Sequence, residues 1–261
     1  MPRNQKKPRK PKNVKNPKKP KCPKKPKNPK KPANPKVPKK KPRKALQTGT
    51  TIMGLEYDGG VVIAADSRVT DGSSVANPLA NKLTRLSKYH YSCCSGVVTH
   101  AQQMCNIVKN RIRAFGDKLG DPLPVHMVAM MFRKTVQMNR SDNATDIITG
   151  GWDKHHGGQI YYICPSGMAV RLRIAISGSG GSTIRGFLHG NYRKDMTLEE
   201  AVDLVTKAGE LALAHDPFSG GVMRIAAVNE TGTIKYGVVS LNRPAFGLTS
   251  DMLWNLEFKY K

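Results

Sequence analysis

The first 49 residues cannot build a packed core, so any fold is confined to the residues that follow. They contain 21 of the 44 Lys and Arg residues, 12 of the 18 prolines and none of the 18 Asp and Glu residues. Prolines recur at every third position from Pro20 to Pro38, which matches the three-residue turn of a polyproline II helix. So few apolar side chains cannot offset the conformational entropy of folding. We therefore expect a disordered Lys/Pro-rich pro-segment over residues 1–49 and one folded domain over residues 50–261.

The basic tail carries most of the chain's net charge of +26. Nucleic acid or an anionic membrane surface would bind such a tail through counterion release. No aromatic residue accompanies the charges, so base stacking and sequence specificity are not expected. We favour a pro-segment that is removed before the protein works. No apolar stretch resembles a secretory signal or approaches the ~20 apolar residues that span a membrane, so no membrane association is predicted.

The cysteines argue against a disulfide framework and a zinc site. They are odd in number and form no CxxC pair: Cys22, Cys93, Cys94, Cys105 and Cys164. Neither structural disulfides nor a tetrahedral metal site fits this spacing. We expect no metal and no cofactor. Free thiols with apolar neighbours suit a reducing compartment, which indicates a cytoplasmic and nuclear location.

Residue patterns predict the order of elements along the folded part. Apolar strands flank Asp58-Gly59-Gly60, which is typical of a tight hairpin. Helical spacing then runs from Val98 to Phe115 and from Val125 to Met138, after the breakers Pro122 and Pro124. Three strands with glycine-containing turns are expected next, in the sequences TDIITGGWD, GQIYYICP and AVRLRIAISG.

Two helices and two strands complete the predicted order. STIRGFLHGNY favours a short helix, and Thr197 with Glu200 forms the capping-box signature of a longer one. The last two strands flank Glu230-Thr231-Gly232. Strands, two helices, strands, two helices and strands predict an α+β fold, a four-layer αββα sandwich in which helix pairs cover two sheets.

The abrupt end of the tail at Gly49 and Thr50 suggests a chemical function. A threonine hydroxyl is a poor nucleophile unless a base takes its proton, and the α-amino group of an N-terminal threonine is one such base. Its ordinary pKa of about 7.7 to 8.0 leaves it partly unprotonated near neutral pH. Cleavage after Gly49 would make Thr50 both nucleophile and base. Glycine before Thr50 gives the backbone the freedom that attack on its carbonyl needs.

The folded part resembles the beta-type subunits of the 20S proteasome, which are N-terminal-nucleophile hydrolases. Among these subunits it is most similar to the caspase-like first subunit and to its interferon-induced immunoproteasome counterpart. The resemblance covers residues 50 to about 248, in order and with the family spacing. It rests on the segments TTIMG at residues 50–54, GGVV at 59–62, ADSR at 65–68, NKL at 81–83, SG at 95–96, GSG at 178–180 and DPFSGG at 216–221.

The resemblance implies the αββα fold of the N-terminal-nucleophile hydrolases and assigns roles to individual residues. Thr50 is the expected nucleophile, and Lys82 the cation that lowers its proton affinity. Asp66 is expected to pair with Lys82 and orient it. The oxyanion donor is the backbone N–H of Gly96. The residues expected around the Thr50 amine are Ser179, Asp216 and Ser219.

The substrate pocket departs from the caspase-like pattern. The caspase-like subunit carries an arginine directly before the Ser-Gly pair, and the induced form carries leucine, whereas this chain has Cys94. A pocket formed by Val69, Thr70, Cys94 and Val98 lacks the charge that would attract acidic side chains. The resemblance therefore implies a small or apolar P1 residue. A buried cysteine that only fills core volume is the other interpretation of Cys94.

Each candidate residue also has a purely structural interpretation. Asp66 alone would suit the end of a strand, Lys82 an exposed surface, Ser179 a turn and Asp216 the loop after a helix. Only their joint spacing favours chemistry. Three other functions stay open: a beta subunit that assembles without cutting, a nucleic-acid-binding protein defined by its tail, and the bacterial two-component threonine protease of the same fold.

The resemblance also implies partners and substrates. The expected assembly is a hetero-oligomeric stack of four seven-membered rings of alpha and beta subunits. Its substrates would be unfolded, ubiquitin-targeted proteins, and its products would include peptides for antigen presentation. Nucleic acid would bind only through the basic tail.

Overall fold

The computed structural model describes residues 49–71, 74–119, 122–139 and 145–240. Apart from Gly49, the predicted pro-segment lies outside the described residues, so its boundary and its disorder stay predictions. Among the described helices, none is both long enough and apolar enough to cross a bilayer.

The first sheet contains the strand that follows Thr50. It has five antiparallel strands in the order β10-β1-β2-β11-β12. Their bounds are β1 Thr51–Tyr57, β2 Gly60–Asp66, β10 Ile174–Gly178, β11 Val222–Asn229 and β12 Gly232–Ser240. The β1–β2 turn at Asp58 and Gly59 and the β11–β12 turn at Glu230 and Thr231 confirm both predicted hairpins.

The second sheet packs against the first and also has five antiparallel strands, in the order β5-β6-β7-β8-β9. Its strands are β5 Leu83–Arg85, β6 His90–Ser95, β7 Asp146–Asp153, β8 Gly157–Ile163 and β9 Ala169–Arg171. A separate two-stranded hairpin, β3 Val69–Asp71 and β4 Ser74–Asn77, precedes it in the chain.

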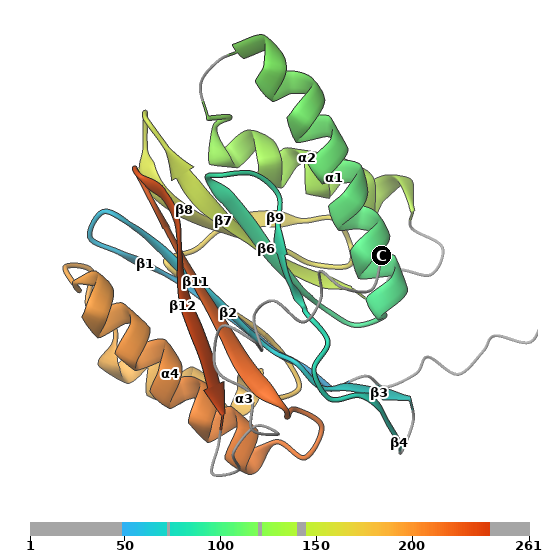
Figure 1. The fold of residues 1–261 in the computed structure, drawn as a ribbon, viewed down its shortest axis with the longest axis vertical. Helices are drawn as coiled ribbons and strands as arrows, with labels where there is room; N and C mark the ends of the chain where they lie inside the picture. Colours follow the sequence, from blue (N-terminus) through green and yellow to red (C-terminus); the bar gives the residue numbers. More distant parts are fainter. Residues whose placement is uncertain (1–48, 72–73, 120–121, 140–144, 241–261) are drawn as a thin grey trace, which may run out of the picture. The chain divides into compact units, whose positions relative to one another are not determined.

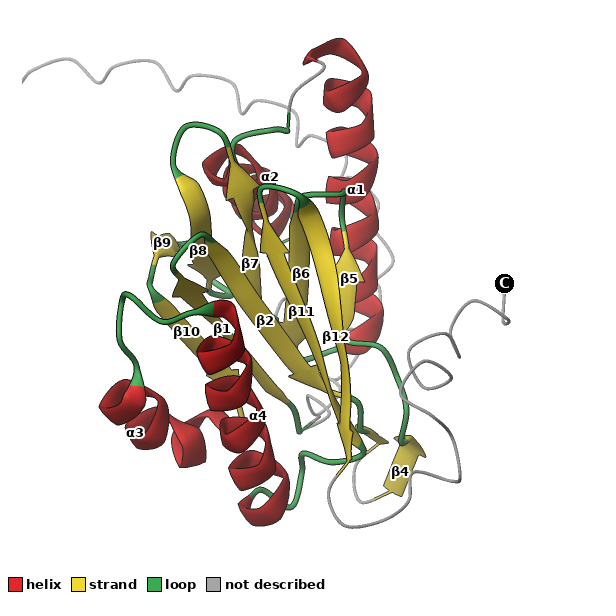
Figure 2. Cartoon of the chain, turned by 60° about the vertical axis from the view of Figure 1, so that its left-hand side comes forward, coloured by secondary structure: helices red, strands yellow, loops and turns green. Residues whose placement is uncertain are grey.

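Two pairs of helices cover the outer faces of the sheets (Figures 1 and 2). α1 (Val98–Leu119) and α2 (Val125–Met138) lie on the second sheet, and α3 (Gly181–Asn191) and α4 (Leu198–His215) lie on the first. The layers are therefore helix, sheet, sheet and helix, which confirms the predicted αββα sandwich.

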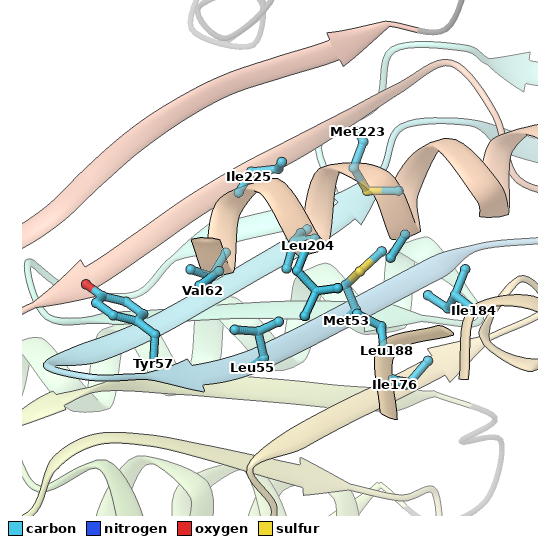
Figure 3. Packing of buried hydrophobic residues seen from close by; sticks show 14 of the residues in the cluster. Met53, Leu55, Tyr57, Val62, Ile176, Ile184, Leu188, Leu204, Met223 and Ile225 are labelled. Atoms are coloured by element: carbon cyan, nitrogen blue, oxygen red, sulfur yellow. The ribbon is translucent and has the colours of Figure 1, made fainter. Parts of the chain in front are cut away.

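Strand alternation divides the buried side chains into three hydrophobic layers. Met53 and Leu55 on β1 point toward α3 and α4, where they meet Leu204 (Figure 3). Ile52, which directly precedes Met53, points instead into the layer between the two sheets. A third layer joins the second sheet to α1 and α2. The start of β1 is thus fixed by packing on both faces of the strand, which holds Thr50 directly before a rigid element.

The α4 start agrees with the sequence prediction, since Thr197 and Glu200 form a complete capping box.

One strand prediction was wrong. AVRLRIAISG forms two strands, because β9 pairs with β8 whereas β10 pairs with β1 in the other sheet. The chain crosses between the sheets at residues 172–173, which periodicity alone does not reveal. Four strands were missed, β3, β4, β5 and β6; the first three are only three or four residues long.

Candidate active site

Thr50 lies immediately before β1, in the interior, and its residue is only 2% exposed. Its hydroxyl donates a hydrogen bond to the carbonyl oxygen of Gly49 at 2.6 Å. The ammonium group of Lys82 donates to Thr50 Oγ1 at 2.9 Å and to the Gly49 oxygen at 3.4 Å. The hydroxyl and the Lys82 nitrogen thus flank the bond at which the chain was expected to be cut.

Gly49 is required by a close approach of the backbone. A Cβ at this position would lie 1.9 Å from Phe218 Cβ and 2.5 Å from the Phe218 carbonyl oxygen. Backbone atoms cannot yield to such a contact without moving the 216–220 loop. The glycine therefore lets the chain entering Thr50 pass against this loop.

Lys82 and Asp66 form a buried ion pair behind the Thr50 hydroxyl. Their N···O distance is 2.7 Å, and the side chains are 5% and 0% exposed. Asp66 Oδ1 also accepts from the N–H of Thr51 at 3.0 Å. Asp66 Oδ2 accepts from the N–H groups of Gly220 at 3.1 Å and Arg68 at 3.3 Å. These donors fix the carboxylate, and the carboxylate in turn fixes the direction of Lys82.

Burial changes the proton affinity of both partners. It lowers the pKa of Lys82 from its ordinary value, against the attraction of Asp66. It raises the pKa of Asp66, against the charge and hydrogen bond of Lys82. Each group therefore needs the other to stay charged, and Lys82 releases a proton more readily than an exposed lysine does.

A second group of hydroxyls surrounds the main-chain nitrogen of Thr50. The Thr50 N–H donates to Ser179 Oγ at 3.1 Å, and Ser179 Oγ donates to Asp216 Oδ2 at 2.6 Å. Ser219 Oγ also donates to Asp216 Oδ2 at 2.6 Å. Since Ser219 gives its hydrogen to Asp216, the 2.7 Å contact between Thr51 and Ser219 is a bond donated by Thr51.

Asp216 caps the C-terminal end of α4 and is held in its ionised form. Burial opposes ionisation, but hydrogen bonds from Ser179, Ser219 and the N–H groups of Phe218 and Ser219 lower the pKa of Asp216. The network thus links a carboxylate to the Thr50 nitrogen through one hydroxyl. It can accept or return a proton at that nitrogen.

A small cavity opens beside Thr50, between the end of β6 and the start of α1. Gly96, which has a φ of 102° at this junction, lies in its wall next to Cys94 and Val98. The remaining lining residues are Asn81, Lys82, Thr84, Ala101, Gln102 and Cys105. Apart from Lys82, the described lining carries no charged side chain.

The structure therefore places the six other residues predicted for catalysis in one cluster with Thr50. It also places Cys94 and Val98 in the cavity, whereas Val69 and Thr70 lie on β3 and are not part of the described lining. Sequence reasoning missed Thr51, whose N–H and hydroxyl join the Asp66 and Ser219 clusters. It also missed Ala101 and Cys105, which lie three and seven residues after Val98 and therefore on the same face of the helix.

Among the described residues, no cluster of three or more His, Cys, Asp or Glu side chains could hold a metal ion. The arrangement at Thr50 contains a hydroxyl, a buried ammonium group and a hydrogen-bonded connection from the Thr50 nitrogen through Ser179 to Asp216.

Comparison with known proteins gives consistent matches. The family model described as proteasome subunit matches residues 46–228. Proteasome subunit beta type-6 of Arabidopsis thaliana is 40% identical over 187 residues, covering 72% of this chain and 80% of the relative. Beta type-6 of Dictyostelium discoideum is 35% identical and covers 77% and 94%. Beta type-9 of Bos taurus is 35% identical and covers 77% and 91%.

Proposed function

Because this chain belongs to the proteasome subunit family and is a beta-type subunit of the 20S particle, we propose that it is a catalytic one, a threonine endopeptidase. A single observation carries this proposal. The Thr50 hydroxyl lies 2.6 Å from the Gly49 carbonyl oxygen and 2.9 Å from the nitrogen of Lys82, which is paired with Asp66. A subunit that only assembles has no need of this buried cation beside a hydroxyl.

Self-cleavage is the first reaction that the geometry supports. Thr50 Oγ1 adds to the carbonyl carbon of Gly49, and negative charge develops on the Gly49 oxygen. Lys82, 3.4 Å from that oxygen, stabilises the charge, and the Gly96 N–H is the proposed second donor. The C–N bond then breaks and the Thr50 nitrogen takes a proton, leaving an ester between Gly49 and the Thr50 hydroxyl. Water hydrolyses the ester, which releases the preceding residues with a carboxylic acid at Gly49 and frees the Thr50 hydroxyl beside the new amine.

Peptide hydrolysis reuses the same atoms. The freed amine occupies the position of the present Thr50 nitrogen, beside Ser179 and Asp216. It accepts the proton of the Thr50 hydroxyl as this attacks the substrate carbonyl, and returns it to the leaving amine. Water then releases the acyl group from Thr50. Lys82 stabilises the developing alkoxide during both attacks, because its ammonium group lies 2.9 Å from Thr50 Oγ1.

The cavity beside Thr50 supports a small or apolar P1 residue. It contains about 20 Å³ of space that a water molecule can occupy, and Thr84, Cys94 and Val98 present no charge to it. An acidic P1 side chain would lose its hydration there without gaining a cation, since Lys82 is already paired with Asp66.

The subunit assembles with other proteasome subunits, as its family membership implies. The proposed substrates are unfolded proteins, which reach Thr50 inside the particle in the cytoplasm and nucleus. The resemblance to the interferon-induced subunit extends the proposal to peptides for antigen presentation.

The decisive test is the N-terminal residue and the intact mass of the subunit from assembled particles. We expect the wild-type chain to begin at Thr50, and a Thr50→Ala chain to retain the residues before it. Thr50→Ser, which keeps a hydroxyl, should still be processed, and Thr183→Ala on the exposed face of α3 should behave as wild type.

Two results would contradict the proposal. A wild-type chain that keeps residues 1–49 in the particle would identify a subunit that assembles without cutting. Processing that survives in Thr50→Ala would assign the cleavage to another protease. In the first case, RNA binding that disappears on deletion of residues 1–49 would favour the tail as the functional element.

A further inference from the structure

Two thiols meet at the base of the cavity beside Thr50. Cys94 on β6 and Cys105 on α1 have their sulfur atoms 3.7 Å apart, and both line the cavity that contains Thr50. Neither is needed for the reaction proposed above. Cys94 is 7% exposed and Cys105 is 2% exposed, so bulky reagents are excluded. The cavity contains about 20 Å³ of space that a water molecule can occupy, so the reagent that fits beside the thiols is one close to water in size, such as hydrogen peroxide.

From this geometry we propose that Cys94 and Cys105 form a modification site for hydroperoxides, which convert the two thiols into a disulfide and thereby close the substrate cavity. The sulfur atoms are already in contact, and the bond requires them to approach to about 2.05 Å. The separation of 3.7 Å must therefore shorten by about 1.65 Å, between a strand and the helix packed against it.

The surroundings make Cys105 the first thiol to react. A hydrogen bond from Cys94 lowers the pKa of Cys105 against the effect of burial, and hydrogen bonds with Ser92 and Thr84 act in the same direction. The same bond raises the pKa of Cys94, which stays a thiol. Ser92 Oγ lies 3.4 Å from the Cys105 sulfur. Cys105 is therefore the better source of thiolate in the pair.

The reaction balances with one molecule of hydrogen peroxide. The Cys105 thiolate attacks a peroxide oxygen, the O–O bond breaks, and a sulfenic acid and hydroxide form. The Cys94 sulfur then attacks the sulfenic sulfur and displaces a second hydroxide. The two thiol protons neutralise both hydroxides, so two thiols and one peroxide give one disulfide and two waters. A thiol reductant reverses the step.

Cys93 provides a matched control within the same strand. Strand alternation turns it away from α1 into the layer between the sheets, where it is fully buried. Burial raises the pKa of Cys93. It is adjacent to Cys94 in sequence but has no route to Cys105, so the pairing we propose is specific.

Peptide mapping tests the bond without relying on catalysis. Assembled particles are treated with hydrogen peroxide, denatured without reductant, labelled with N-ethylmaleimide and digested with trypsin. All three cysteines lie in one tryptic peptide, residues 89–109. We expect three labels before oxidation, and afterwards one label, on Cys93, with two hydrogens lost. Reductant should restore three. Cys105→Ser should abolish the mass loss, and Cys93→Ser should retain it.

Closure of the cavity is tested on the same samples with a small electrophilic peptide that acylates Thr50; this part rests on the proposed function. We expect labelling of Thr50 to fall about tenfold, as a displacement near the reacting group would cause, and to return with reductant. In Cys105→Ser, the ratio of treated to untreated labelling should stay near one.

The outcomes separate the two proposals. Three labels after treatment, or a sulfinic acid on Cys105 without a disulfide, would overturn the modification site. A disulfide without loss of Thr50 labelling would overturn the closure. Particles that never label at Thr50 would contradict the proposed catalytic function, while the mapping result would still decide the disulfide.

Discussion

Lys82 illustrates how one buried side chain can contribute both to stability and to the proposed chemistry. It is buried, donates to Thr50 and Asp66, and has its pKa lowered by burial. Removing one member of a buried ion pair strands the other charge, and this costs on the order of 3–5 kcal/mol. A single substitution at Lys82 therefore cannot separate loss of folding from loss of chemistry.

A pair of variants makes that separation. We predict that Lys82→Met abolishes cleavage after Gly49 and lowers the free energy of unfolding by roughly 3–5 kcal/mol. Adding Asp66→Asn should recover part of the stability, because no uncompensated charge remains, without recovering cleavage. Denaturant unfolding and N-terminal sequencing measure the two effects. Cleavage in either variant would exclude Lys82 from the reaction.

Cys94 sets the polarity of the cavity wall. We predict that Cys94→Arg shifts hydrolysis toward acidic P1 residues, because the new cation would offset the desolvation of a carboxylate. The ratio of kcat/KM for Asp over Val at P1 should rise about tenfold, or about 1.4 kcal/mol. Fluorogenic peptides that differ only at P1 measure this ratio. Cys164→Arg, outside the cavity, is the control, and an equal shift there would disprove the assignment.

His90 should make stability depend on pH. Burial lowers the pKa of His90 from 6.5 to about 4, against the nearby charge of Asp153. The unfolded chain takes up a proton near pH 6.5 and the folded chain only near pH 4. Stability is therefore complete above pH 6.5 and falls by roughly 3 kcal/mol as the pH drops to 4.

Unfolding of the wild type and His90→Gln measures this effect across that pH range. The difference between the two proteins cancels the carboxylates that titrate in both. A difference that does not change with pH would show that His90 is protonated normally in the folded state.

At the scale of elements, β11 holds the segment that leads to Lys82. Arg224 on β11 is 2% exposed and donates to the carbonyl oxygens of Ala80 at 2.6 Å and Leu79 at 3.0 Å. The guanidinium donates to the two carbonyls through two separate nitrogen atoms held in one plane, a geometry that the single nitrogen of an ammonium group does not reproduce. A strand distant in sequence thus sets the start of β5 and the position of Lys82, the proposed catalytic cation.

We predict that Arg224→Lys slows self-cleavage while the fold persists. The charge stays, but one carbonyl loses its donor, so stability should fall by about 1–3 kcal/mol. Pulse-chase measurement of the precursor and processed chain gives the rate, and circular dichroism checks the fold. Arg85→Lys, on the exposed side of β5, is the control. An unchanged rate in Arg224→Lys would show that Lys82 is positioned without this strand.

At the scale of the whole molecule, processing would change the electrostatics of the protein. The full chain has a net charge of +26, whereas the part from Thr50 onward has 23 basic and 18 acidic residues, a net charge of +5. Polyanion binding depends on the number of phosphates that are neutralised and weakens with salt. The precursor and the product should therefore differ sharply in their interaction with nucleic acid.

We predict that the Thr50→Ala precursor elutes from a heparin column at a much higher salt concentration than the chain that begins at Thr50. Each neutralised charge adds to the salt dependence, so the slope of log K against log salt should be steeper for the precursor. Equal elution would mean that the tail's charges are masked in the precursor.

The sequence by itself determined much of this protein. Helical periodicity, the capping box at Thr197 and the glycine-containing turns are signals between close neighbours, so they predicted both helix pairs and both hairpins correctly. The Gly49–Thr50 boundary predicted Thr50 as the nucleophile, because a free α-amine needs a terminal threonine. The family resemblance added the other residues proposed for catalysis.

Only the tertiary structure decided which distant residues meet. Ser179 lies 129 positions from Thr50 and reaches its N–H because β1 pairs with β10 in one register. Pairing of distant segments also decides three other features: the division of AVRLRIAISG between two sheets, the hydrogen bonds of Thr51, and the contact between Cys94 and Cys105. Such contacts depend on strand register and on packing between layers, and neither leaves a pattern in a short stretch of sequence.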